Sequence, residues 1–312
     1  MIGLRITLFG KLEVQQGDQL VVGLESRKVQ ELLCYLLLFR DRSHPREVLA
    51  DLLWGELPTA KSKSYLRKVL WQLQTTLDAV PEASMNSVLL IEADHLQINP
   101  DFELWLDTAI CEQAFALVQG VPGQELDRDQ AEIVQKAVDL YRGDLLEGWY
   151  QSWCLYERER LQYMYLALLD KLMKYCEVHQ QYQAGITNGI RALRYDNARE
   201  RTHRRLMRLQ YLAGFRTAAL RQYDRCCAAL ERELGVKPNQ RTQALYQQIR
   251  ADSLESLAPE VTEISEEKIG GLPELLSHLE ILNFMLTTTQ RQIQQDIQRV
   301  KQAIIDRHWP GA

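Results

Sequence analysis

Three consecutive segments near the start of the chain carry hydrophobic side chains at helical spacing. The first runs from Arg27 through Leu33 and beyond, the second from Pro45 through Trp54, and the third covers Lys61–Leu77 and is basic at its start. Apolar residues that recur every three or four positions are typical of amphipathic helices. Three short helices in this order predict a helix-turn-helix, in which the last helix lies in the major groove of DNA.

The residues on either side of these helices alternate between apolar and polar, which is the period of a half-buried strand. Leu4, Ile6 and Leu8 alternate with polar neighbours, and short apolar runs follow at 12–14 and 20–22. After the third helix, residues 88–91 and 96–98 flank a turn and predict a hairpin. Residues 1–100 are therefore predicted to form a winged helix preceded by a small β-sheet.

The third helix has two different faces when it is projected at 100° per residue. Leu66, Leu70, Leu73 and Leu77 fall on one side and predict the buried face. Basic residues on the other side would neutralise phosphates, and Ser or Gln could contact base edges. The residues predicted to contact DNA are Lys61, Lys63, Ser64, Tyr65, Arg67, Lys68, Trp71, Gln72 and Thr75 of this helix, together with Arg46 and His95.

Trp71 has two interpretations on this outer face. Its ring could contact a sugar or a thymine methyl group, or it could pack against a neighbouring domain. For the charged residues, a solvated helix face is the alternative to a DNA contact.

Strand patterns give way to helical periodicity from Trp105 onward. Helices are predicted at 127–142, 149–178, 181–194, 198–213, 215–233 and 238–251. Residues 181–186 and 215–220 resemble each other at an offset of 34 residues, so that Ala184 aligns with Ala218. This period is typical of tetratricopeptide (TPR) repeats, which stack into a curved binding surface. Residues 101–251 are therefore predicted to form an all-α TPR-like domain.

The rest of the chain is predicted to contain a linker, at 252–272, and a long helix, at 273–308. Leu279, Leu286, Ile293 and Val300 recur every seven residues in this helix, which is an imperfect coiled-coil pattern. It favours a homodimer, and the alternative is a helix that folds back on the repeat domain. The overall fold class is mainly α.

Charge is distributed unevenly along the chain. The net charge of −5 argues mildly against a nucleic-acid partner, but residues 26–74 contain nine basic and five acidic residues. DNA affinity depends on this local balance. Residues 194–250 carry thirteen basic and five acidic residues, and Arg201, Arg204, Arg205 and Arg208 are candidates for an anion or partner surface. The alternative is ion pairing between these arginines and the acidic residues of 101–193.

Several short motifs together resemble one family. They are Leu24–Lys28, Arg46-Glu47-x-Leu49, Leu66-Arg67-x-x-Leu70, Ile91–Pro100, Trp105-x-Asp107, Tyr141–Leu146, Trp153, Arg158-x-x-Leu161, Glu200–Met207, Ala219–Tyr223 and Glu233–Pro238. The chain resembles the SARP-like regulators (Streptomyces antibiotic regulatory proteins), which carry a bacterial transcriptional activator domain (BTAD). The resemblance covers residues 4–250. It implies an OmpR-type winged helix that binds direct repeats in double-stranded DNA and recruits RNA polymerase, followed by a TPR-like activator domain.

Two features qualify this resemblance. The family usually has Arg-Leu-Arg where this chain has Gln72-Leu73-Gln74, so two cationic DNA contacts are absent. The loop at 55–60, which touches the polymerase in OmpR-type proteins, is short.

The sequence contains no motif that favours an enzyme, a cofactor or a metal site. Phosphate-binding glycine loops, zinc-type cysteine spacing and nucleophile elbows are all missing. The six cysteines are expected to be reduced and mostly buried, and neither a signal peptide nor a membrane span is evident, so a cytoplasmic location is predicted.

The pattern as a whole predicts a DNA-binding transcription regulator that activates its targets. A TPR-type interaction scaffold whose winged helix does not bind DNA, and a sensor for an anionic ligand, are the alternatives.

Overall fold

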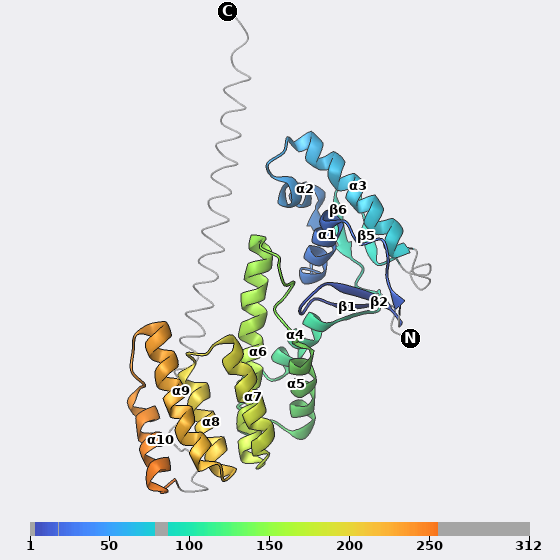
Figure 1. Ribbon diagram of the computed structural model, residues 1–312. Helices are drawn as coiled ribbons and strands as arrows, with labels where there is room; N and C mark the ends of the chain where they lie inside the picture. Colours follow the sequence, from blue (N-terminus) through green and yellow to red (C-terminus); the bar gives the residue numbers. More distant parts are fainter. Residues whose placement is uncertain (1–3, 18, 79–86, 255–312) are drawn as a thin grey trace, which may run out of the picture. The chain divides into compact units, whose positions relative to one another are not determined.

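The computed structural model describes residues 4–17, 19–78 and 87–254, and the residues as far as Leu254 form one compact unit (Figure 1). The predicted helix at 273–308 and nearly all of the predicted linker at 252–272 lie outside the described residues, and so does the dimerisation that they favour.

The chain begins with a four-stranded sheet whose last strand comes from much later in the sequence. Its strands are β1 (Leu4–Thr7), β2 (Glu13–Gln16), β3 (Gln19–Leu20) and β7 (Leu104–Leu106), in the order β3-β2-β1-β7. The first three form an antiparallel ladder, as predicted, whereas β7 lies parallel to β1 and pairs Ile6 with Leu106. The sequence pattern missed β7 because three residues are too few to show an alternation.

A helix-turn-helix and a second small sheet follow. The helices are α1 (Arg27–Leu38), α2 (Arg46–Trp54) and α3 (Thr59–Asp78), which pack against one another. The predicted hairpin is present as β5 (Leu89–Ile91) and β6 (His95–Ile98), and β4 (His44–Pro45) adds to it in the order β4-β6-β5. This arrangement confirms the predicted winged helix.

The remaining described residues are helical, which confirms the mainly α fold class. The helices are α4 (Asp107–Leu117), a 3-10 turn at Gly123–Glu125, α5 (Arg128–Leu140), α6 (Ser152–Val178), α7 (Tyr182–Tyr195), α8 (Glu200–Leu212), α9 (Arg216–Leu234) and α10 (Gln240–Ala251). Six of them lie where the periodicity predicts a helix. The exception is α4, whose apolar residues do not gather on one side, so that it shows no amphipathic pattern.

The helices from α6 to α9 pack in sequence, each against the next. Helices α7 and α9 begin at Tyr182 and Arg216, which are 34 positions apart, as the predicted repeat requires. Of the two small residues in the repeat segment 181–186, Ala184 is exposed, and Gly185 lies at the helix contact. Gly185 and Gly189 make the close approach, and a methyl group at Gly189 would lie 2.6 Å from Leu206 Cδ2.

The sheet and the helical region are joined by buried hydrogen bonds around the end of β1. The Asp107 carboxylate, in the first turn of α4, accepts the backbone N–H groups of Leu8 (2.8 Å) and Phe9 (2.9 Å). The segment before α6 continues this contact, since Leu146 N–H donates to Leu8 O at 2.9 Å and Gly10 N–H to Asp144 O at 2.8 Å. One hydrophobic core extends across this joint, from Leu4 to Ala192.

We expect Gly189→Ile to destabilise the protein by about 3 kcal/mol, because the added side chain collides with Leu206 and Met173 and overpacks the contact between α6, α7 and α8. The measurement is urea-induced unfolding followed by circular dichroism. Thr187→Ile is the matched control on the exposed side of the same helix and should change stability by less than about 0.5 kcal/mol. Equal effects of the two substitutions would contradict the close approach at Gly189.

Asp107 should make stability depend on pH. Burial raises the pKa of its carboxyl from the ordinary 3.8 to about 6, although four backbone amides, those of Phe9, Leu8, Thr108 and Asp107 itself, oppose this rise. The folded protein therefore holds the proton more tightly than the unfolded chain. The stability that Asp107 adds is fully present below pH 4 and declines as pH increases through about 6, by about 3 kcal/mol in total.

Asp107→Asn removes this titration, so the difference in free energy of unfolding between wild type and variant should shift in favour of the wild type as pH falls from 7.5 to 4. Urea unfolding of both proteins at several pH values measures this difference. A difference that stays constant with pH would mean that the amides keep the carboxylate ionised.

Candidate nucleic-acid interface

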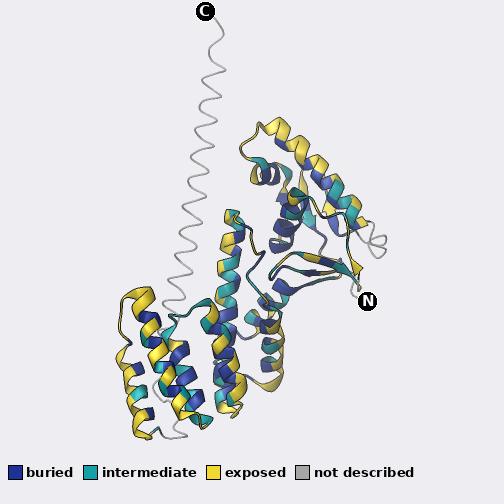
Figure 2. Cartoon of the chain, viewed as in Figure 1, coloured by how far each residue is buried: buried dark blue, intermediate teal, exposed yellow. Residues whose placement is uncertain are grey.

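Helix α3 is held in place by its leucine side. Leu66, Leu70, Leu73 and Leu77 are at most 3% exposed, which confirms the predicted buried face, and Val69 joins them at 9%. The opposite side of α3 faces solvent along its length (Figure 2). The sequence period therefore sets which residues of α3 are available to a ligand.

The start of α3 is fixed by a buried serine that the sequence analysis did not select. Ser62 Oγ donates toward the carbonyl oxygens at the end of α2 and in the turn, the nearest being that of Trp54 at 3.2 Å. The turn between α2 and α3 is only four residues long, from Gly55 to Pro58. A serine in the first turn of a helix is a common sequence feature, so nothing in the sequence alone marks Ser62 as important.

Most residues predicted to contact DNA do lie on the exposed side of α3. Trp71 is 68% exposed and Tyr65 47% exposed, while Gln72 is half-buried. The alternative for Trp71 is packing against a neighbouring domain. Because its side chain is exposed, the described residues give no support to that alternative. The other exposed members of the set are Lys61, Lys63, Ser64, Arg67, Lys68 and Thr75.

Some of these side chains already have partners within the winged helix. Lys63 forms an ion pair with Glu47 of α2, and the Tyr65 ring lies 6.0 Å from that of Trp54. Thr75 donates its hydroxyl to the carbonyl of Trp71, one turn back. Within the described part of the chain, by contrast, Lys61, Arg67 and Lys68 form no ion pair, so their charges are available to phosphates.

Arg46 and His95 lie where α2 meets the hairpin. The Arg46 guanidinium donates to the carbonyls of Glu92 (3.3 Å) and Ala93 (3.2 Å), and its backbone N–H donates to Asp94 O at 2.8 Å. His95 is exposed at the start of β6. Arg46 thus positions the hairpin relative to α2, which is a role that the sequence pattern did not suggest.

The arginines predicted as an anion or partner surface have carboxylate partners. Asp170 of α6 forms ion pairs with Arg205 (2.8 Å) and Arg201 (3.3 Å). Arg208 pairs with Glu177 at 2.6 Å, and Arg204 lies 3.9 Å from Glu200. The pairs to Asp170 and Glu177 join α8 to α6, as in the alternative of inter-helix ion pairing. A surface role for these four arginines stays a prediction.

The structure adds three general facts about chemistry. All six cysteines are unpaired thiols, and five of them are buried. Among the described residues, no group of three or more His, Cys, Asp or Glu side chains is arranged to hold a metal ion. None of the described helices combines the length and the apolarity that crossing a bilayer requires.

Parts of this architecture match known proteins. Residues 106–250, from the end of β7 to the end of α10, match the family model of the bacterial transcriptional activator domain. This match assigns residues 106–250, and not the whole chain, to the bacterial transcriptional activator domain (BTAD). Over 248 residues (79% of the chain) it is 27% identical to the regulatory protein AfsR of Streptomyces coelicolor, and it spans only 24% of the length of that relative.

A solved structure supports the fold of the chain across both regions. Mycobacterium tuberculosis EmbR, in complex with a low-affinity phosphopeptide, superposes with a TM-score of 0.58 at 19% sequence identity. The match covers 88% of this chain and 71% of EmbR.

Several residues that carry the family resemblance lie at the joint of the chain and not on an open surface. Arg158 donates to three carbonyls of the segment before α6, those of Leu145, Leu146 and Trp149, at 2.9–3.0 Å. Leu146 has a φ of +47°, a conformation that is costly for a residue with a side chain. Arg158 thus stabilises an unfavourable turn that the joint requires.

Proposed function

We propose that this protein is a DNA-binding transcription regulator that activates its targets, with α3 in the major groove and the β5–β6 hairpin beside it. The observation that carries the proposal is the outer side of α3, where Lys61, Arg67 and Lys68 are exposed and form no ion pair among the described residues. Ser64 and Gln72 on the same helix are suited to base edges.

The charges on α3 suit a phosphate backbone better than a protein partner. The three free cations are spread over two turns of one helix, with the exposed ring of Trp71 beyond them. Phosphate contacts supply most of the affinity for DNA and fix its register. Because Gln72 and Gln74 replace the arginines usual in the family, we expect weaker affinity and a different sequence preference.

The helical domain would then supply regulation or partner contact. Its consecutively packed helices resemble TPR repeats, which present binding surfaces. RNA polymerase is the partner that the family resemblance implies, and a homodimer would place two winged helices on repeated half-sites and raise affinity through effective concentration. A cytoplasmic location fits these partners.

The test is the salt dependence of binding to a fluorescent duplex of about 30 base pairs taken from upstream of the protein's own gene. The double variant Lys61→Ala, Lys68→Ala should bind more weakly, and the slope of log affinity against log salt should become shallower by about 1.8, the value for two lost phosphate contacts. Fluorescence anisotropy at four or more salt concentrations measures both quantities.

Lys136→Ala with Lys237→Ala is the matched control, because both lysines are exposed and lie on helical-domain segments away from α3. It should leave the slope unchanged. If the Lys61/Lys68 variant keeps the wild-type slope, α3 is not the DNA-contacting helix. If the wild type does not bind DNA at low salt, the proposal fails and the interaction scaffold replaces it.

A further inference from the structure

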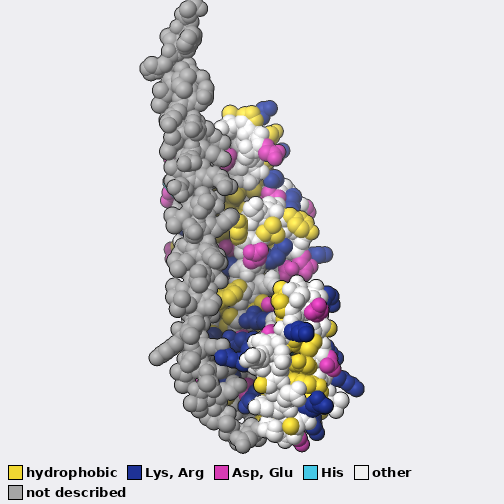
Figure 3. Space-filling model, turned by 90° about the vertical axis from the view of Figure 1, so that its left-hand side faces the viewer, with side chains coloured by type: hydrophobic (Ala, Val, Ile, Leu, Met, Phe, Trp, Pro, Cys, Tyr) yellow, Lys and Arg dark blue, Asp and Glu magenta, His cyan; other side chains and the backbone are white. Residues whose placement is uncertain are grey.

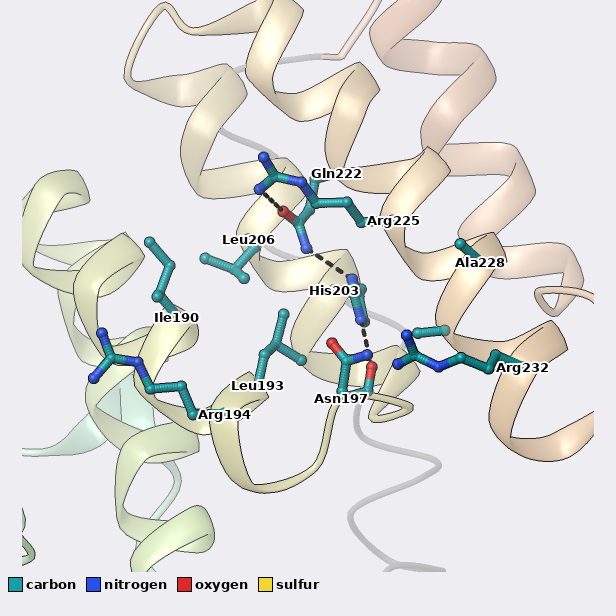
Figure 4. A pocket seen from close by; sticks show the side chains of 11 residues that line it. Ile190, Leu193, Arg194, Asn197, His203, Leu206, Gln222, Arg225, Ala228 and Arg232 are labelled. Carbon is teal, nitrogen blue, oxygen red and sulfur yellow. Dashed lines mark hydrogen bonds between the residues drawn. The ribbon is translucent and has the colours of Figure 1, made fainter. Parts of the chain in front are cut away.

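The helical domain contains an open groove whose arginines are not those selected from the sequence. It lies between α7, α8 and α9 and has a volume of about 370 Å³ (Figure 4). Its arginines are Arg194 at the end of α7, and Arg225 and Arg232 on α9. Among the described residues no acidic side chain lines the groove, although the Glu233 carboxylate accepts hydrogen bonds from two lining residues, Asn197 and Arg232.

These three guanidinium groups carry charge that the fold leaves largely unpaired. All three side chains are exposed, and within the described residues neither Arg194 nor Arg225 forms an ion pair. Arg232 pairs only with its neighbour Glu233, where its side chain remains 70% exposed. An exposed pair of this kind is weak. The groove therefore attracts anions, in contrast to Arg201, Arg205 and Arg208, whose carboxylate partners lie inside the fold.

The floor of the groove is aliphatic. Ile190 and Leu193 of α7, Leu206 of α8, and Ala228 and Ala229 of α9 line it between the arginines. The two alanines leave room beside the α9 backbone. An occupant must therefore combine negative charge with apolar side chains, and free inorganic anions satisfy only the first requirement.

A chain of hydrogen bonds runs from one of the arginines to the loop before α8. Arg225 donates to Gln222 Oε1 (3.4 Å), and Gln222 Nε2 donates to His203 Nδ1 (2.7 Å). His203 in turn donates from Nε2 to Asn197 O at 2.9 Å. Gln222 and His203 are 2% and 1% exposed, and burial lowers the pKa of His203, so the ring is neutral and the network adds no charge. Arg225 therefore keeps its charge available at the groove, next to a neutral network.

The arrangement of the arginines favours several carboxylates over a single compact anion. Arg225 and Arg232 are seven residues apart on α9, which corresponds to about 10 Å along the helix axis. Arg194 lies on the opposite side of the groove, on α7 (Figure 4). An extended peptide in the polyproline II conformation presents every third side chain on one face, about 9 Å apart, which matches this spacing.

We propose that this groove binds a short, extended segment of a partner protein in which acidic residues recur at about every third position, with aliphatic residues between them. Guanidinium groups bind carboxylates with bidentate hydrogen bonds, and the aliphatic floor takes the residues between them. On the face drawn in Figure 3, Lys and Arg side chains lie among hydrophobic and acidic ones. The inference stands whether or not α3 binds DNA.

The first experiment selects binders to the full-length protein from a random heptapeptide library at 150 mM salt. We expect enrichment of peptides that combine Asp or Glu with Leu, Ile or Val, and we expect the charge-reversed variant Arg194→Glu, Arg225→Glu, Arg232→Glu to enrich Lys and Arg instead. If the wild type enriches no acidic peptides, the proposal is overturned.

The second experiment measures the affinity of the most enriched peptide by fluorescence anisotropy. Arg225→Ala with Arg232→Ala, and separately Ala228→Trp, should each weaken binding at least tenfold, the first by removing charge and the second by filling the groove. A peptide with Gln in place of Glu should show the same loss. The control variant Arg142→Ala, Lys237→Ala, which removes two exposed charges outside the groove, should stay within twofold of wild type.

Circular dichroism establishes that each variant is folded. Binding that survives Ala228→Trp, or that the control variant weakens equally, would overturn the proposal in favour of nonspecific charge attraction. If the Arg225/Arg232 variant loses affinity for DNA and not for the peptide, these arginines belong to a nucleic-acid surface and the proposal is wrong.

Discussion

The structure depends on the hydrogen bonds at the end of β1. There the first turn of a helix and a loop segment both bond to the backbone of residues 8–10. Asp107 accepts the amides of Leu8 and Phe9, and the segment at 144–147 bonds to the neighbouring backbone. Phe9 also packs its ring 4.4 Å from Tyr141, which stacks on Tyr165 at 4.1 Å. An unpaired amide in this buried place would cost about 1–3 kcal/mol, so the winged helix and the activator domain are built as one unit.

Helix α1 connects this joint to the helix-turn-helix. Glu31 is 5% exposed, pairs with Lys28, and accepts from Gln151 at the start of the activator-domain helix α6. The Arg27 guanidinium lies 3.8 Å from the centroid of the Trp149 ring. Helix α1 also packs against α3, so it contacts both α3 and the residues just before α6. These charged and aromatic contacts add to the hydrophobic core that already extends across the two regions.

Much of the architecture was predictable because it follows from local periodicity. The leucine side of α3, the hairpin and six helices of the activator domain were located correctly, since an amphipathic helix shows its buried side in the spacing of its residues. Strand β7 and helix α4 were not, because one is three residues long and the other has no apolar side. The repeat alignment drew attention to Ala184, which is exposed, whereas Gly185 and Gly189 make the close approach, since an alignment shows which positions correspond and not which of them face the next helix.

The sequence by itself determined the mainly α class, the winged helix, the family and the excess of arginine between residues 194 and 250. Only the tertiary structure decided which of those arginines are free. Asp170 and Glu177 lie on α6, and folding brings them to Arg205 and Arg208, whereas Arg194 and Arg225 meet no carboxylate among the described residues. Composition counts charges along the chain, but ion pairing depends on distances of a few ångströms between residues far apart in sequence, and those distances are set by helix packing.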